Sequence, residues 1–406
     1  MLNWMDNNPK KTFFLIFFVL YIVSDLLVTK YYLPDVKGIY HSYYNHGLRK
    51  NYTGIFWWGD RSYRVYTNSL GFKDSEIREV PKKVNQHRIL FIGDSFTEGA
   101  GLPYEKTFVS MFHEKAGPFN FDVLNAGVVS YSPKLYYLKL KYLLETTDLD
   151  FDELFVFIDI SDIQDEIDYS IWNPVVETRF HQLDSYLRSI SITYKILRQN
   201  VLNSSDLPFL SKIKQYFNKM ETHLGETENK SVDSETQAVV QSRAINVTRE
   251  ANQLTLIDNN RKDAEIRTKA FKIPDDFKTN HNLERPKWTY DQEIYDKWGK
   301  EGLELAGTYM DKVVSLMRKH NIKMHIVVYP WPEQIINNDL NSRQVAYWKA
   351  FSEARDVGFI NLFPDFFISK ADKTIQKYFI PGDVHWNKVG HELVAERLYQ
   401  YRLDVK

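Results

Sequence analysis

Short apolar runs alternate with amphipathic segments along much of the chain after residue 86. Five of the runs are largely apolar, as in buried parallel strands, and they lie at 88–92, 122–124, 154–158, 324–329 and 358–362. Helical spacing occurs between and after them, at 104–116, 133–145, 300–319 and 387–401. This alternation predicts an α/β fold in which helices cover both faces of a parallel sheet.

A longer apolar run lies near the N-terminus at 13–28, interrupted by two polar residues. Lys10 and Lys11 precede it, which favours a cytoplasmic N-terminus. We expect residues 1–34 to be an uncleaved signal anchor that enters the membrane through residues 12–28, with the rest of the chain outside the cytoplasm. The alternatives are a cleaved signal peptide, for which the sequence offers a poor cleavage site, and a buried soluble helix.

Two further segments lengthen the chain beyond the α/β pattern. Residues 35–85 are rich in Tyr, Trp, Asn and Gly, and the alternation at 63–67, followed by turn residues, predicts a small β-rich module. An insertion at about 166–286 separates the third strand from the fourth, and its part 221–285 is polar enough to be typical of a mobile excursion. We therefore expect one α/β domain at 86–406 that carries this insertion.

The composition excludes several classes of chemistry. Lys and Arg number 52 against 53 Asp and Glu, so the chain lacks the basic excess of a nucleic-acid binder. The absence of cysteine excludes disulfides, cysteine-ligated zinc and a cysteine nucleophile. Aromatic residues make up 15%, which indicates either a large aromatic core or a surface on which sugars stack.

The motif Gly93-Asp94-Ser95-Phe96-Thr97-Glu98-Gly99 directly follows the first predicted strand. Ligands bind at the carboxyl ends of strands in open α/β sheets, so Ser95 is placed where a substrate would lie. We expect a helix N-terminus there, which helps to stabilise negative charge. A serine hydroxyl becomes a strong nucleophile only when a base removes its proton.

A base and an orienting carboxylate are present near the other end of the chain. His385 lies just before the closing helix, and Asp383 precedes it by two residues. These residue types can act as the base and the group that fixes the tautomer of that base, in any chain order. His391 is the nearest rival among eleven histidines, but it falls inside the closing helix, where we expect it to pack or to face solvent.

The Gly-Asp-Ser-Phe-Thr-Glu-Gly block and the terminal Asp-x-His loop together resemble the SGNH (GDSL) hydrolase superfamily, over about 86–165 and 287–406. The resemblance implies a three-layer α/β/α sandwich with a five-stranded parallel sheet of flavodoxin-like type. It implies Ser95 as nucleophile and oxyanion donor, Gly127 as a second donor, His385 as base and Asp383 as its partner. It implies no metal and no organic cofactor.

Two departures from the family pattern change what we expect of the oxyanion hole and of the substrate. The third block usually carries an oxyanion-hole Asn, where this chain has Ser161; loss of one such donor costs about 2.7–4 kcal/mol of transition-state stabilisation. The terminal block is Asp-x-His followed by Trp386, and this resembles the alginate O-acetyltransferase-like branch, whose members act on exported polysaccharides. The resemblance therefore implies an acylated carbohydrate or other ester as substrate and a membrane acyltransferase as a partner.

Three aromatic residues are candidates for substrate binding. Tyr329 and Trp331 follow the fourth predicted strand, and with Trp386 they are expected either to form an aromatic wall for a sugar or to belong to a turn stiffened by proline. Asp162 and Asp165 suggest a cation site, but we favour a solvated helix start. The expected function is a membrane-anchored esterase or O-acetyltransferase, and the alternative is a catalytically weak carbohydrate-binding or scaffold protein.

Overall fold

The computed structural model describes residues 7–31, 38–59, 61–174, 187, 191–194, 196–197 and 285–404. The chain divides into two compact units, one formed by Met1–His46 and Pro174–Glu235, the other by Gly47–Asn173 and Thr236–Lys406. The boundary between residues 46 and 47 falls inside the segment expected to form a β-rich module. Most of the expected insertion, including the polar stretch 221–285, lies outside the described residues.

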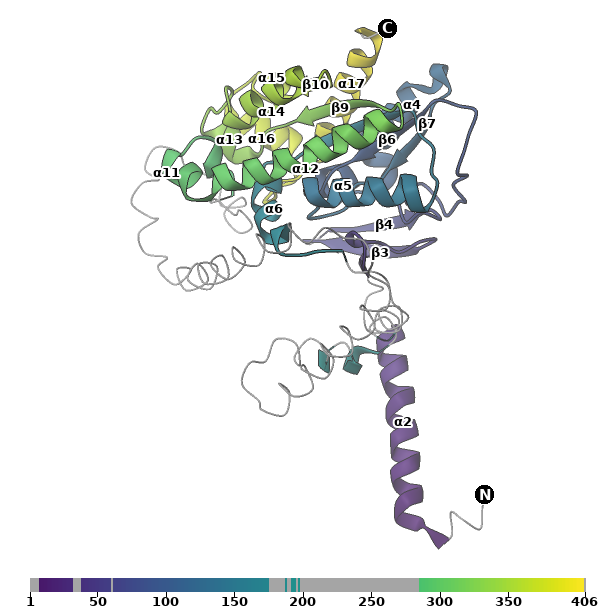
Figure 1. Ribbon diagram of the computed structural model, residues 1–406. Helices are drawn as coiled ribbons and strands as arrows, with labels where there is room; N and C mark the ends of the chain where they lie inside the picture. Colours follow the sequence, from purple (N-terminus) through teal and green to yellow (C-terminus); the bar gives the residue numbers. More distant parts are fainter. Residues whose placement is uncertain are drawn as a thin grey trace, which may run out of the picture. The chain divides into compact units, whose positions relative to one another are not determined.

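The first unit contains helix α2 (Pro9–Tyr31), drawn in purple in Figure 1. Its residues Pro9–Thr29 have a mean hydropathy of 2.3, and none of this stretch is buried. At 1.5 Å per residue such a helix reaches about 30 Å, the thickness of the apolar part of a bilayer. The helix is therefore long and apolar enough to be a membrane anchor or a signal sequence. Strands β1 (Gly38–His41) and β2 (Asn45–Leu48) pair in a separate two-stranded sheet.

The second unit is built on an eight-stranded sheet with the order β10-β9-β8-β6-β7-β5-β4-β3. Its first five strands in this order run parallel, which confirms the expected α/β class with five parallel strands. These strands are β6 (Arg88–Ile92), β7 (Asp122–Asn125), β8 (Glu153–Ile158), β9 (Lys323–Val328) and β10 (Gly358–Asn361). Every residue of β6 and β8 is buried, as expected for strands covered on both faces.

Three antiparallel strands continue this sheet beyond β7. They are β3 (Thr53–Trp58), β4 (Arg61–Thr67) and β5 (Lys73–Asp74), and β5 joins the parallel part through the pairing of Lys73 with Asn125. Residues 53–74, expected to belong to a module packed on the main domain, thus belong to the central sheet itself. The sequence shows strand alternation here, but strand pairing depends on contacts distant in the chain.

Helices lie on both faces of the parallel strands (Figure 1). On one face α5 (Pro133–Lys141), α6 (Asp162–Ser170) and α12 (Lys300–Lys319) pack together, and on the other α4 (Phe108–Lys115) packs against α17 (Lys388–Asp404). The remaining described α-helices are α3 (Ser95–Glu98), α11 (Gln292–Ile294), α13 (Pro332–Ile336), α14 (Arg343–Ala354), α15 (Phe363–Phe366) and α16 (Ala371–Tyr378).

Strand β6 lies at the point where the chain reverses its direction across the sheet. Its two neighbours are β7 and β8, the next strands along the chain, which lie on opposite sides of it. The loops that follow β6 and β8 therefore diverge at the carboxyl edge of the sheet, which is the usual place for a ligand in such folds.

The opposite, amino-terminal edge of the sheet is tied together by a buried carboxylate. Glu153 opens β8 and accepts hydrogen bonds from His325 Nε2 at 2.7 Å, from His87 Nε2 at 3.0 Å and from Arg402 at 2.9 Å. Burial opposes ionisation of Glu153, but these partners lower its pKa to about 2. The contacts connect strands β8 and β9 with the closing helix α17, far from the carboxyl edge.

Candidate active site

Residues 93–99 make a tight turn from strand β6 into helix α3. Asp94 caps the helix by accepting a hydrogen bond from the Phe96 N–H at 3.0 Å. A Cβ atom on Gly93 would lie 2.2 Å from Thr97 Oγ1 and 2.9 Å from Phe157 Cβ, so the turn needs glycine there. Helix α3 begins at Ser95, so the expected helix N-terminus is present, and with four residues the helix is a single turn.

The structure brings Ser95, His385 and Asp383 together in a chain of hydrogen bonds. Ser95 Oγ lies 2.7 Å from His385 Nε2, and His385 Nδ1 lies 2.5 Å from Asp383 Oδ1. Because the carboxylate accepts from Nδ1, the neutral imidazole keeps Nε2 free of a proton and able to accept the Ser95 hydrogen. Ser95 and His385 are each 7% exposed, so the pair is nearly excluded from bulk water.

Asp383 is held as an anion by several donors. Burial opposes ionisation of Asp383, but the hydrogen bonds of His385, and the charge that this imidazole carries when it is protonated, bring the pKa of Asp383 below the usual range. The Asp383 Oδ1 atom also accepts from the His385 backbone N–H at 2.9 Å, and Oδ2 accepts from Trp58 Nε1 at 2.6 Å. The sequence did not identify Trp58 as part of the site. The alternation of residues along a strand shows on which face a side chain lies, but not that Trp58 contacts Asp383, 325 residues away.

The rival histidine, His391, packs inside the domain. It is 1% exposed, and its Nδ1 accepts a hydrogen bond from the Phe108 N–H at 3.1 Å. Burial, together with the positive charge of Lys73, lowers its pKa to about 3, so this imidazole stays neutral. Of the two expectations for His391, packing inside the domain is therefore confirmed. The His391 side chain joins the closing helix to the start of α4.

The second sequence block lies directly against helix α3. Asn125 Nδ2 donates to the Thr97 carbonyl at 2.8 Å, and a Cβ atom on Gly127 would come within 2.6 Å of the Glu98 backbone nitrogen. Gly127 was expected to offer its N–H to an oxyanion. In this structure that N–H donates to Asn125 Oδ1 at 3.1 Å, so it must exchange partners to serve a substrate.

Ser161 follows strand β8, the neighbour of β6, and therefore lies on the same edge of the sheet as Ser95. It is 4% exposed, and its backbone N–H donates to Asp159 Oδ1 at 2.6 Å. The Ser161 hydroxyl is shorter than the Asn side chain that the family pattern places here. The structure brings the position to the correct edge, and the oxyanion role of Ser161 stays a prediction.

Three buried carboxylates gather beneath Ser95. Oxygen atoms of Asp94, Asp159 and Asp162 lie within 4.8 Å of one another. Burial, and the charge of the neighbouring carboxylates, raise the pKa of Asp94 and of Asp162 well above the usual range. Protein donors already contact all three residues: Tyr329 Oη lies 3.2 Å from Asp94, Trp331 Nε1 2.8 Å from Asp159 and Tyr136 Oη 2.7 Å from Asp162.

The expectation of a solvated helix start at Asp162 and Asp165 was wrong. Asp162 is fully buried and Asp165 is 6% exposed. Helix α6 begins soon after the carboxyl end of β8 and packs against α5 and α12. Its first turn therefore lies in the interior and not in water. Asp165 pairs with Arg285, near the end of the expected insertion, and burial nevertheless raises the pKa of Asp165 to about 6.

Of the two alternatives for Tyr329, Trp331 and Trp386, the aromatic wall is not available to a substrate. Tyr329 and Trp386 are fully buried, and Trp331 is 5% exposed. Tyr329 Oη donates to Asp94 at 3.2 Å, and the rings of Tyr329 and Trp386 both pack on Phe96. These side chains point into the domain, where they find hydrogen-bond acceptors and apolar rings beneath the Ser95 turn. They therefore pack against the turn from the interior of the domain.

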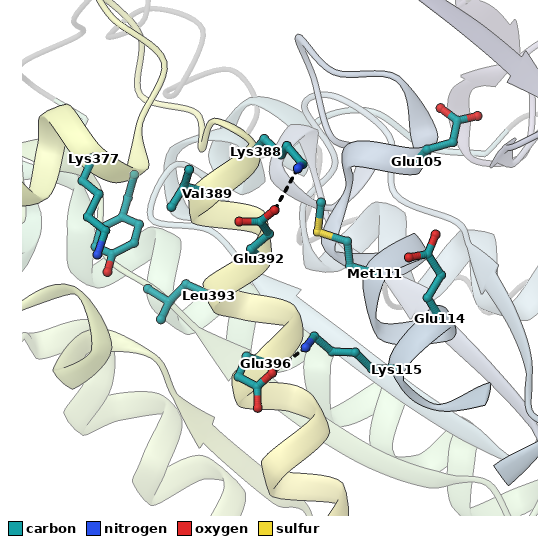
Figure 2. A pocket seen from close by; sticks show the side chains of 11 residues that line it. Glu105, Met111, Glu114, Lys115, Lys377, Lys388, Val389, Glu392, Leu393 and Glu396 are labelled. Carbon is teal, nitrogen blue, oxygen red and sulfur yellow. Dashed lines mark hydrogen bonds and ion pairs between the residues drawn. The ribbon is translucent and has the colours of Figure 1, made fainter. Parts of the chain in front are cut away.

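A surface groove of about 720 Å³ lies away from the serine site, along helices α4, α16 and α17 (Figure 2). An ion pair crosses it between Lys115 on α4 and Glu396 on α17 at 2.6 Å, and Lys388 pairs with Glu392 along α17 at 3.0 Å. None of Ser95, His385 and Asp383 lines this groove.

No family model matches the chain, and no curated protein matches it. Solved structures that are similar include a GDSL-like lipase from Bacteroides thetaiotaomicron, with 9% identity, a TM-score of 0.35 and coverage of 80% of this chain and 93% of that chain. An acetyl xylan esterase has 11% identity, a TM-score of 0.35 and coverage of 77% and 98%. A putative acylhydrolase from Bacteroides fragilis has 10% identity, a TM-score of 0.34 and coverage of 80% and 92%.

Likeness at this level of identity and TM-score carries no argument about activity or substrate. What the site can do chemically therefore rests on its own geometry: a buried serine hydroxyl that donates to an imidazole, whose other nitrogen is held by a carboxylate.

Proposed function

We propose that this protein is a serine esterase of the SGNH type that acts on O-acyl esters through Ser95. One observation carries the proposal: Ser95 Oγ lies 2.7 Å from His385 Nε2, and the other ring nitrogen of His385 lies 2.5 Å from Asp383 Oδ1. A serine hydroxyl placed against an oriented imidazole is the arrangement that turns it into a nucleophile.

In the first half-reaction His385 Nε2 takes the Ser95 proton as Oγ attacks the ester carbonyl. The bond from Oγ to the acyl carbon forms, and the carbonyl oxygen becomes an oxyanion. Backbone N–H groups of Ser95 and Gly127 are the proposed donors to that oxygen, with the Ser161 hydroxyl in place of the usual Asn. The bond to the alkoxide then breaks, and His385 returns its proton to the leaving alcohol.

In the second half-reaction an acceptor hydroxyl gives its proton to His385 as its oxygen attacks the acyl carbon on Ser95. The bond between Ser95 Oγ and the acyl carbon then breaks, and His385 returns the proton to Oγ. Water as acceptor gives hydrolysis, and a sugar hydroxyl gives acyl transfer. Incubation with an acetyl donor, with and without an oligosaccharide, separates the two outcomes by mass. An oligosaccharide that gains an acetyl group identifies a transferase, and free acetate alone identifies a hydrolase.

We propose acetylated cell-envelope or exported polysaccharide as the substrate class. Two features support it: the Asp-x-His-Trp block at 383–386, and the apolar helix at Pro9–Thr29, which would hold the enzyme at a membrane. A membrane acyltransferase is the partner that a transferase of this kind requires as acyl donor. The scaffold alternative is weakened, because the three aromatic residues considered for a sugar-binding wall are buried, but the replacement of the usual oxyanion-hole Asn by Ser161 still supports it.

The activity is tested with p-nitrophenyl acetate and the full-length chain in detergent. The wild type is expected to release nitrophenol, and Ser95→Ala is expected to lose at least about 10³-fold in kcat, since the nucleophile is gone. Equal turnover by the two proteins would exclude Ser95 as the nucleophile.

We also propose that the catalytic unit lies outside the cytoplasm. The cysteine-free chain allows a direct test with single cysteines and a membrane-impermeant maleimide in intact cells. Lys83→Cys, at an exposed position after α2, is expected to react, whereas Asn7→Cys, exposed before α2, is expected to react only after the cells are opened. The reverse pattern contradicts the proposed orientation.

A further inference from the structure

Two adjacent tryptophans on the outermost strand of the sheet have opposite surroundings. Trp57 and Trp58 end strand β3, whose residues alternate between the two faces. Trp57 is 66% exposed and faces outward. Trp58, one residue later, turns to the other face and reaches the hydrogen-bonded pair of Asp383 and His385.

The Trp58 ring contacts both members of that pair. Its Nε1–H donates to Asp383 Oδ2 at 2.6 Å, and its ring meets His385 edge to face, with ring centres 4.9 Å apart and planes at 86°. Asp383 Oδ1 is occupied by the backbone and side chain of His385. Trp58 therefore supplies the donor for the second carboxylate oxygen.

The ring is also confined on its other side. A Cβ atom added to Gly101 would lie 3.3 Å from Trp58 Cδ1 and 2.9 Å from Ile380 Cδ1. Gly101 follows helix α3, and Ile380 precedes Asp383 by three residues. The indole thus packs between the two segments that carry the serine and the carboxylate, which leaves its N–H little freedom to point elsewhere.

We propose that Trp58 is a positioning residue, whose indole N–H fixes the Asp383 carboxylate in the orientation that aligns His385 with Ser95; this inference rests on the proposed function. A carboxylate held at one oxygen alone can rotate about its Cβ–Cγ bond, and each rotation moves the acceptor away from His385 Nδ1. Anchoring the second oxygen stops that rotation. The β3–β4 hairpin is by this account a part of the active site, although it lies outside the sequence blocks that resemble a known family.

The test compares Trp58→Phe with Trp57→Phe in the full-length chain, using p-nitrophenyl acetate. Loss of a partner that orients a catalytic group costs about 10-fold to 100-fold. We expect Trp58→Phe to lose that much in kcat with KM changed less than about twofold, because Trp58 acts through the base and not through substrate binding. Trp57→Phe, on the exposed face of the same strand, is expected to keep the wild-type kcat.

A second variant separates positioning from folding. Replacing Trp58 with β-(3-benzothienyl)alanine keeps the shape of the ring and exchanges the N–H for sulfur. The same loss in kcat at an unchanged melting temperature supports the hydrogen bond. Wild-type kcat in this variant, in a preparation where Ser95→Ala is inactive, overturns the inference and leaves the proposed function intact.

A spectroscopic measurement tests the contact without any turnover. In the full chain carrying ¹⁵N-labelled tryptophan, the indole N–H signal that disappears in Trp58→Phe is expected to shift when Asp383→Asn removes the charge of its acceptor. The signal that disappears in Trp57→Phe is expected to stay in place. An unmoved Trp58 signal overturns the inference, whereas an inactive wild type would count against the proposed function alone.

Discussion

Ser95 Oγ and His385 Nε2 lie 2.7 Å apart although 290 residues separate them in the chain. The first lies at the end of the central strand β6, and the second lies in the loop before α17. Helix α17 packs on α4, the helix that follows the Ser95 turn, and this packing brings the loop to the serine. The site is therefore assembled by the packing of the fold and not by neighbouring positions in the sequence.

Asp383→Asn is expected to lower kcat by about 10⁴-fold, because an amide N–H in place of the carboxylate favours the wrong tautomer of His385. Steady-state turnover of p-nitrophenyl acetate measures this. Asp372→Asn, at an exposed position on α16, is the control and is expected to behave as wild type. A decrease below about tenfold in Asp383→Asn would show that His385 does not depend on Asp383.

Gly127→Ala is expected to lower kcat strongly while the sheet stays folded. The added Cβ would come 2.6 Å from the Glu98 backbone nitrogen and 2.7 Å from the Thr97 carbonyl carbon, so helix α3 must move. A shift of about 1 Å in a catalytic group can cost about 100-fold in rate. Gly117→Ala is the matched control, because a Cβ at that glycine meets nothing within 4 Å. Equal rates in both variants would contradict the close approach.

The sequence predicted the parallel strands and main helices well, because their apolar periodicity comes from burial. The strand at 88–92 and the helix at 300–319 have the predicted bounds. Ser95, His385 and Asp383 were likewise found from motif and position, and the structure brings them together.

What the sequence could not predict depends on side-chain direction and distant pairing. The sequence left open whether Trp331 lines a sugar-binding wall or belongs to a turn; it points inward to Asp159, and a strand end gives no sign of which way its side chains turn. The solvated start expected at Asp162 was wrong for the same reason. Trp58 was missed because its partner, Asp383, lies 325 residues away in the loop before α17, and local alternation carries no information about that loop.

Asp162→Asn is expected to stabilise the fold increasingly as the pH rises. Burial and the charges of Asp94 and Asp159 raise the pKa of Asp162 well above its ordinary value of 3.8. The folded chain then binds a proton that the unfolded chain releases, so wild-type stability falls with increasing pH above about 4, by at most about 1.4 kcal/mol per pH unit. Asparagine at position 162 does not titrate, and its side-chain oxygen still accepts the hydrogen bond from Tyr136 Oη.

Thermal unfolding between pH 5 and pH 8 measures this effect. The difference in melting temperature between Asp162→Asn and wild type is expected to grow across the range. Asp372→Asn, which removes an exposed carboxylate, is expected to give a small and constant difference. A constant difference for Asp162→Asn as well would mean that its carboxyl does not titrate differently in the folded chain.

Glu153→Gln is expected to destabilise the fold by about 3 kcal/mol at neutral pH, because it leaves Arg402 without its buried anion. Burial opposes ionisation, but His325, His87 and Arg402 lower the pKa of Glu153 from 4.5 to about 2. Its stabilising contribution is thus complete above about pH 4.5 and is lost as the pH falls towards 2. The variant should lose this acid dependence.

Urea unfolding at several pH values measures the contribution of Glu153. Glu396→Gln, which breaks the exposed pair with Lys115, is the control and is expected to cost at most about 1 kcal/mol. Below its unfolding midpoint Glu153→Gln should keep esterase activity, since Glu153 lies at the edge of the sheet opposite Ser95. Equal stability of Glu153→Gln and wild type would contradict the structural role.

The central claim is that Ser95 becomes a nucleophile through His385. The most direct measurement is the mass of the peptide containing Ser95 after the full-length protein reacts with a fluorophosphonate. One phosphonyl group is expected on Ser95, and its rate of attachment is expected to fall at least about 100-fold in His385→Gln. A wild type that hydrolyses p-nitrophenyl acetate while Ser95 stays unmodified, or labelling that is as fast in His385→Gln, would contradict the account.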